Sequence, residues 1–189
     1  MHSFTSFDGH KRIVTGPLPA VAVAVKRAIA GGAAGPVLIF DNVTGRSIDI
    51  DTRGADEEII ERLGSPAPPS PDAVRGRGRP KLGVVAREVT LLPRHWEWLA
   101  AQPGGASVVL RKLVDEARRA HGDRDMARKT QERAYHFMSA MAGDLPGFEE
   151  ATRALFANDV PRFTDLIAAW PSDIRDHTAL LASNQIDSP

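Results

Sequence analysis

The sequence predicts a mixed α+β protein made of four consecutive parts. In the first 64 positions, short apolar runs separated by turn residues are typical of β-hairpins, and two stretches with helical spacing interrupt them. Proline and glycine then dominate a tract that suits neither helix nor sheet. Helical periodicity prevails in most of the remaining chain. We therefore expect a small ββαββα domain (residues 1–64), a linker (65–83), a strand-helix-helix segment (84–121) and a helical region (122–189).

Two hairpins and two helices make up the predicted first domain. Residues 4–15 flank Asp8-Gly9, a dipeptide typical of a tight hairpin turn. Apolar residues recur at helical spacing over 18–29, and a pair of glycines follows them as a helix stop. Residues 37–51 predict the second hairpin. Acidic residues suit a helix N-terminus, so the run that starts at Asp56 predicts a short helix.

Composition argues against several classes of function. The 189 residues include no cysteine, which excludes disulfides, thiolate metal sites and cysteine nucleophiles. Six histidines are scattered singly, and no phosphate-binding or nucleophile motif is present, so we expect no cofactor, no metal and no enzymatic activity. No stretch is long and apolar enough for a membrane span, and the N-terminus lacks the layout of a signal peptide. We therefore expect a cytoplasmic protein without membrane contact.

The formal net charge of zero conceals an uneven distribution. Residues 75–121 carry ten lysines or arginines against four acids. From Gly122 onward there are eleven acids against seven basic residues. A polyanion would therefore be attracted to the centre of the chain, which favours double-stranded DNA as the partner.

A basic tract at the end of the linker resembles an AT-hook. Its core is Arg77-Gly78-Arg79-Pro80. In such a tract glycine lets the backbone lie deep in a narrow minor groove, and the arginines follow the electronegative floor of A·T sequences. The resemblance implies DNA contacts by Arg75, Arg77, Gly78, Arg79, Pro80 and Lys81. The same composition also suits a solvated basic linker, and the sequence leaves both interpretations open.

The segment that follows resembles a ribbon-helix-helix module. A β-rich run over 84–92 precedes a helix that starts at Pro93 and extends to about Gln102. Pro103-Gly104-Gly105 ends that helix, and Ser107 is a suitable N-cap for a second one. The resemblance implies that two chains pair their strands into an antiparallel ribbon that enters the major groove. It also implies that the start of the second helix holds a phosphate.

The ribbon-helix-helix resemblance assigns roles to individual residues. It implies DNA contacts by Glu88, Thr90, Gly105, Ala106 and Ser107, and a homodimer interface formed by Val85, Arg87, Val89, Leu91 and Trp96. The sequence departs from the pattern in three ways. Arg87 occupies a position that is usually apolar, the first helix is about half a turn short, and Glu88 on the reading side repels phosphate.

Nearly the whole chain resembles a bacterial family known as domain of unknown function 2239. The resemblance is carried by residues 77–84, 92–96, 168–171 and 174–177, and it implies no particular activity. The function that we predict is DNA binding, as a dimeric transcriptional regulator or a nucleoid-associated factor. One alternative is a protein-interaction or small-molecule sensor module in which the basic tract is only a linker. A further alternative is an enzyme of unrecognised type.

Overall fold

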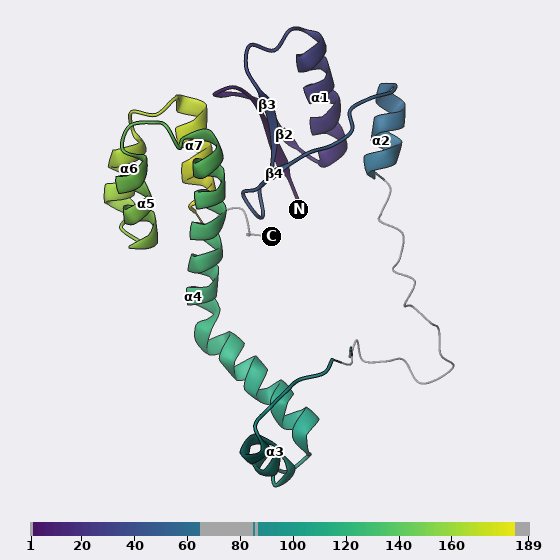
Figure 1. The fold of residues 1–189 in the computed structure, drawn as a ribbon, viewed down its shortest axis with the longest axis vertical. Coiled ribbons are helices and arrows are strands. Elements are labelled where there is room, and N and C mark those ends of the chain that lie inside the picture. The colour runs from purple at the N-terminus through teal and green to yellow at the C-terminus, as the bar shows by residue number, and fades with distance from the viewer. Residues whose placement is uncertain (1, 65–84, 86, 184–189) are drawn as a thin grey trace. The chain divides into compact units, whose positions relative to one another are not determined.

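A computed structural model describes residues 2–64, 85 and 87–183 of the chain. It has the expected ββαββα order followed by helices (Figure 1), which confirms the α+β class. None of the described helices is long and apolar enough to cross a lipid bilayer. The first elements are β1 (Phe4–Asp8), β2 (Lys11–Gly16), α1 (Leu18–Ala30), β3 (Val37–Asp41), β4 (Ser47–Ile48) and α2 (Asp56–Gly64). The later ones are α3 (Pro93–Ala100), α4 (Ala106–Met141), α5 (Phe148–Phe156), α6 (Val160–Ile167) and α7 (Ser172–Leu181).

The chain divides into two compact units that differ from the expected parts. Residues 1–66 and 124–189 form the first unit, and residues 67–123 form the second. The first and last parts of the chain, which we described as separate parts in the sequence, lie in the same unit. Helix α4 begins in the second unit and ends in the first.

The first unit contains a four-stranded antiparallel sheet in the order β2-β1-β3-β4. A tight turn at Gly9-His10 joins β1 to β2, and Gly9 adopts a φ of 52°, which favours glycine. The neighbouring Asp8 carboxylate accepts hydrogen bonds from the backbone N–H groups of Ala34 (3.0 Å) and Gly35 (2.7 Å). These bonds fix the hairpin turn against the loop that precedes β3.

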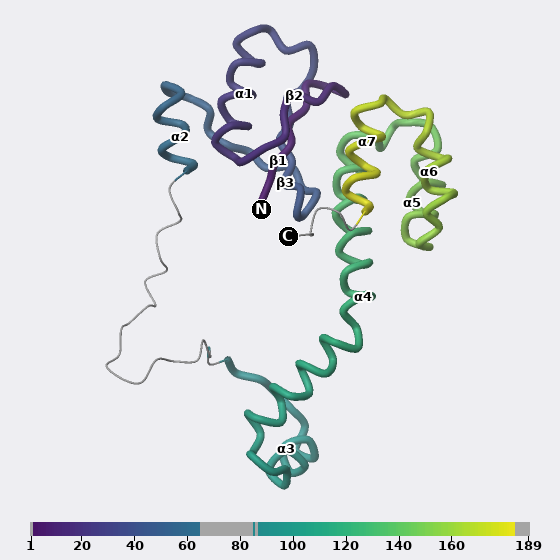
Figure 2. The backbone as a smooth tube through the Cα atoms, turned by 180° about the vertical axis from the view of Figure 1, so that it is seen from behind, coloured from purple at the N-terminus to yellow at the C-terminus, as the bar shows by residue number. Residues whose placement is uncertain are grey.

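Alternate residues of the strands point to opposite faces of this sheet, and helices cover both faces. On one side Ile39 packs against Val21 and Val25 of α1. On the other side Phe7 and Phe40 belong to the core that the C-terminal helices form. The two views agree on this layering, with the sheet between α1 and the pair formed by α7 and the C-terminal part of α4 (Figures 1 and 2).

Aromatic rings join the first and last parts of the chain. The ring centroid of Phe137 on α4 lies 5.3 Å from that of Phe7 and 4.9 Å from that of Phe40. Phe137, Met138 and Met141 are all buried, as their spacing along the sequence predicts. The second face of the sheet is thus apolar and is covered by helices from the end of the chain. This shared core is the physical reason why both parts form one unit.

Helix α4 is a single helix of 36 residues, where the sequence indicated two helices separated near Gly122. A glycine inside a helix costs only about 1 kcal/mol relative to alanine, so it does not by itself end one. Two salt bridges along the helix surface support the residues that follow. Arg128 pairs with Asp125 at 3.3 Å and with Glu132 at 3.9 Å.

The strand expected over residues 84–92 is not present in the part of that range that the structure describes. Its described residues, 85 and 87–92, belong to neither a helix nor a paired strand. In the ribbon-helix-helix interpretation the partner strand comes from a second chain, so one chain by itself lacks the hydrogen-bond partners of a ribbon.

Candidate nucleic-acid interface

Helix α3, a short turn and the beginning of α4 form the described core of the second unit. Pro93 starts α3, since its fixed φ suits the first helical position and its missing N–H is not needed there. The turn ends with Gly104 and Gly105, whose φ values are 88° and 76°. Residues other than glycine rarely adopt such φ values, so the glycine pair allows the chain to reverse between the two helices.

Three of the predicted phosphate contacts lie together where α4 begins. The backbone carbonyl of Gly105 accepts the first helical hydrogen bonds, from the N–H groups of Val108 and Val109 at 3.2 Å each. Gly105 therefore caps the helix, whereas Ser107, which we expected to be the cap, lies in the first turn. The N–H groups of a first turn have no acceptor within the helix, so Ala106 and Ser107 retain donors that an anion can use.

Exposed cations follow along the same two helices. They are Arg94 on α3 and Arg111, Lys112, Arg118 and Arg119 on α4. Two of them donate to backbone carbonyls one turn earlier, Arg111 to Ser107 at 3.1 Å and Arg119 to Asp115 at 3.2 Å. None of these five takes part in a salt bridge with a described acid. Their charge is therefore available to a polyanion.

The same segment exposes large apolar side chains. Among its described residues Leu99 is the one large apolar side chain in the core, with 3% of its surface exposed. Trp96 is 42% exposed, Val89 52% and Val114 55%. The other exposed apolar residues of this segment are Val85, Leu92, Trp98 and Leu113. The described residues of this segment therefore bury little apolar surface among themselves.

The remaining predicted contacts are less closely grouped. Glu88 and Thr90 are exposed, as are Arg87 and Val89 of the predicted dimer interface, while Leu91 is half-buried. The expected alternation between covered and groove-facing residues is therefore absent from the described part of the single chain. The AT-hook-like tract, with Arg75, Arg77, Gly78, Arg79, Pro80 and Lys81, lies outside the described residues.

Several residues of this surface were not among the predicted contacts. The cations at the beginning of α4 contribute to the basic excess of residues 75–121 but were not predicted as individual contacts, and Leu113 and Val114 were not predicted at an interface. The apolar part of this surface was visible in the sequence, because apolar residues recur there at helical spacing, at Leu110, Leu113, Val114 and Ala117. Among the described residues, no group of three or more histidines or acids is placed to bind a metal ion.

Comparison with known proteins gives one match. The sequence profile of a bacterial family, described as "Uncharacterized protein conserved in bacteria (DUF2239)", matches residues 3–182. No curated protein and no solved structure matches the chain significantly. The match covers both structural units and nearly the full length of the chain.

Proposed function

We propose that this chain, which belongs to the bacterial family of uncharacterized proteins (DUF2239) that matches residues 3–182, binds double-stranded DNA as a homodimer. Within this proposal, it acts as a transcriptional regulator or nucleoid-associated factor. One observation carries the proposal. The described part of the second unit combines exposed cations that lack acidic partners with apolar side chains that lack cover. The cations suit a phosphate backbone, and the apolar side chains suit a second copy of the same segment.

The finer form of the proposal is a ribbon-helix-helix dimer preceded by an AT-hook. It assigns residues 85–91 to the ribbon and the N–H groups at the beginning of α4 to a phosphate. This form is supported by the succession of two helices, α3 and α4, with two glycines of positive φ in the turn between them. The arginine tract before the ribbon would then enter the adjacent minor groove.

The dimer leads to a prediction about mass in solution. Light scattering of the full chain at micromolar concentration should give twice the mass of one chain. Val89→Asp should give a monomer, because a buried carboxylate at the ribbon has no partner charge. Ile60→Asp is the matched control, since Ile60 is 49% exposed on α2 of the first unit, and it should remain dimeric. A parent protein that is monomeric throughout would contradict the ribbon.

The arginine tract leads to a prediction about salt. Each arginine that neutralises a phosphate releases about one condensed counterion, so DNA affinity falls steeply as salt rises. Replacing both Arg77 and Arg79 by alanine should therefore flatten the plot of log affinity against log salt by about two units. The loss should be greater on A·T-rich than on G·C-rich duplexes, because the guanine amino group obstructs the minor groove.

A matched double variant tests whether the effect is specific to the tract. Arg153 and Arg162 are exposed on α5 and α6 of the first unit, and their replacement by alanine should leave the slope unchanged. A changed slope with equal losses on both duplexes would indicate nonspecific charge attraction. An unchanged slope for Arg77 and Arg79 would mean that the tract is a linker.

The exposed apolar surface also supports a second candidate function. A protein-interaction or sensor module would use Trp96, Trp98 and their apolar neighbours to bind a different protein. It predicts a monomer without measurable DNA affinity, so the two experiments above separate the candidates.

A further inference from the structure

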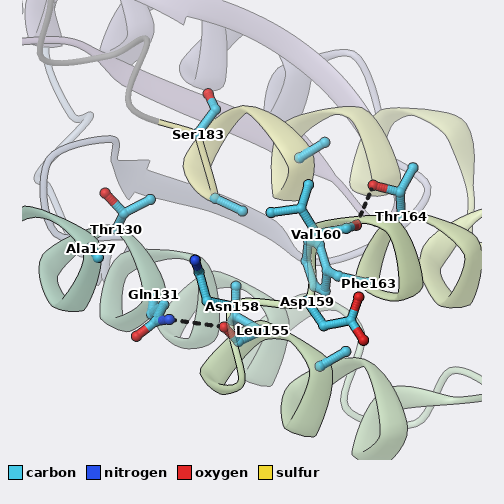
Figure 3. Close-up of a pocket in the computed structure, with 13 residues that line it drawn as sticks. Ala127, Thr130, Gln131, Leu155, Asn158, Asp159, Val160, Phe163, Thr164 and Ser183 are labelled. Carbon is cyan, nitrogen blue, oxygen red and sulfur yellow. Dashed lines mark hydrogen bonds between the residues drawn. The ribbon is translucent and has the colours of Figure 1, made fainter. Parts of the chain in front are cut away.

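A pocket of about 340 Å³ opens between the C-terminal part of α4 and helices α5, α6 and α7 (Figure 3). All of its lining residues belong to the first unit. Four alanines line it, together with Leu155, Val160 and Phe163. Side chains as small as alanine leave space between packed helices, whereas protein interiors are otherwise filled. The volume lies within the range of small-molecule sites.

The polar groups at this pocket are almost all engaged within the protein. The Gln131 amide donates to the backbone carbonyl of Leu155 at 3.0 Å, and the Thr164 hydroxyl donates to that of Val160 at 2.9 Å. The Ser183 hydroxyl donates to the carbonyl of Leu180 at 2.8 Å. The two hydroxyl groups thus use their only protons within the helices, whereas the Gln131 amide uses one of its two N–H groups.

Charge is nearly absent from the lining. Among the described residues that line it there is no lysine, arginine or histidine, and Asp159 is the single ionisable one. The Asp159 carboxylate accepts from the backbone N–H of Arg162 at 3.2 Å and caps the start of α6. An anion would therefore find no partner charge in this pocket and would be repelled by a carboxylate.

Asn158 differs from the other polar residues of the lining. Its side-chain amide makes no hydrogen bond with any described residue. Figure 3 shows the side chain directed toward α4, near Thr130 and Gln131. Asn158 is exposed, so its amide is open to water and also available to a molecule in the pocket, with N–H groups to donate and a carbonyl to accept.

The backbone of Asn158 explains how the amide is positioned. Its φ is 57°, and it directly follows the C-cap of α5. The next N–H, that of Asp159, donates to the carbonyl of Ala154 at 3.0 Å, which closes the helix end. Glycine is favoured at such a position, because a side chain adds strain there. Asparagine serves the same backbone turn and in addition provides the amide.

We propose that this pocket binds a small, uncharged, mainly apolar molecule whose carbonyl or hydroxyl oxygen accepts a hydrogen bond from the Asn158 amide. The apolar part of the ligand lies against Leu155, Val160 and Phe163. The site belongs to the first unit, and the proposal does not depend on DNA binding.

Three probes of equal size but different charge test the proposal. They are 4-phenylbutan-2-one, 3-phenylpropanoate and 4-phenylbutan-2-amine, each titrated into the full ¹⁵N-labelled chain. The ketone should shift the amide resonances of residues that line the pocket, with saturation at roughly millimolar concentration, as expected for so few heavy atoms. The carboxylate should bind at least about tenfold more weakly, because it must lose its hydration without gaining a partner charge.

Two variants connect the binding to the pocket. Asn158→Gly keeps the left-handed turn and removes the amide, so ketone affinity should fall about three- to tenfold while the melting temperature is retained or raised. Ala127→Leu should fill part of the space and abolish the shifts. Ala127 is only half-buried, and if this variant did not fold, Asn158→Gly would still decide the role of the amide.

Three results would contradict the proposal. The absence of saturable shifts at the pocket with any probe would overturn the site. Binding of the carboxylate or the amine as tight as that of the ketone would overturn the assignment of an uncharged ligand. Unchanged ketone affinity in Asn158→Gly would overturn the role of the amide.

Discussion

Replacing Gly45 by alanine should lower the free energy of unfolding by roughly 3–5 kcal/mol, from backbone strain and overpacking together. Gly45 lies between β3 and β4 with a φ of 67°. A Cβ atom there would overlap the carbonyl group of Arg133 on α4 and lie 2.8 Å from its Cα atom. These are backbone atoms of a helix, which cannot rotate away as a flexible side chain can. The turn or the helix must therefore move.

The surrounding hydrogen bonds oppose such a movement. The carbonyl of Thr44 is 3.0 Å from Nδ1 of His136 on α4. A carbonyl only accepts, so Nδ1 carries the proton and Nε2 accepts from Arg46 at 3.1 Å. The buried Arg133 in turn donates through Nε to the carbonyl of Leu181 at 2.7 Å, at the end of α7. A shift of the turn would break its bonds to α4, and a shift of α4 would disturb α7.

Gly32 provides the matched control for this experiment. It has a φ of 81°, and no heavy atom lies within 4 Å of the position that a Cβ would occupy. Gly32→Ala should therefore show the strain alone, about 1 kcal/mol. Urea unfolding with linear extrapolation measures both variants. Equal losses in the two variants would show that Gly45 has no close approach to α4.

Acid should destabilise the protein through His177, by up to about 3 kcal/mol between pH 6.5 and pH 4. His177 on α7 is fully buried, and its ring lies 5.4 Å from that of Phe7 and 4.7 Å from that of Phe137. Neither ring nitrogen has a hydrogen-bond partner among the described residues. Burial, with a smaller contribution from the Arg12 charge, lowers the pKa of His177 from 6.5 to about 4.

The direction of the effect follows from the two states of the chain. The folded protein holds His177 neutral, whereas the unfolded chain binds a proton at the ordinary pKa near 6.5. Well above pH 6.5 both states hold His177 neutral, so the free energy of unfolding has its full value there. It declines by about 1.4 kcal/mol per pH unit as the pH falls toward 4, because protons bind the unfolded chain preferentially.

His177→Leu isolates this contribution. Leucine has a comparable volume and no ionisable group, so the variant should lose about 3 kcal/mol less than the parent between pH 7 and pH 4. It should also be at least as stable as the parent at pH 7, since it removes two buried nitrogens without partners. His10→Gln, which replaces an exposed histidine, should retain the acid loss. An unchanged acid loss in His177→Leu would contradict the buried neutral imidazole.

Local patterns in the sequence determined the elements of this protein and their order. Short apolar runs around turn residues predicted the hairpins, and helical spacing or a proline at the start predicted α1 and α3. Phe137, Met138 and Met141 recur at helical spacing in the sequence, and all three are buried. Each of these signals acts over one or two turns of chain, so it is visible without knowledge of the partner surface. The charge asymmetry likewise pointed to the basic segment of the second unit.

The tertiary structure alone decided which distant segments pack together. An apolar face such as that of Phe7 and Phe40 shows that cover is needed, but it does not show whether α2 or a helix more than a hundred residues away provides it. The same limit applies to Gly45, whose close approach to Arg133 joins distant positions, and to His177, whose residue type gives no sign of its aromatic surroundings. The continuity of α4 through Gly122 was not evident from the sequence either, because a helix breaker costs only about 1 kcal/mol and flanking interactions can offset it.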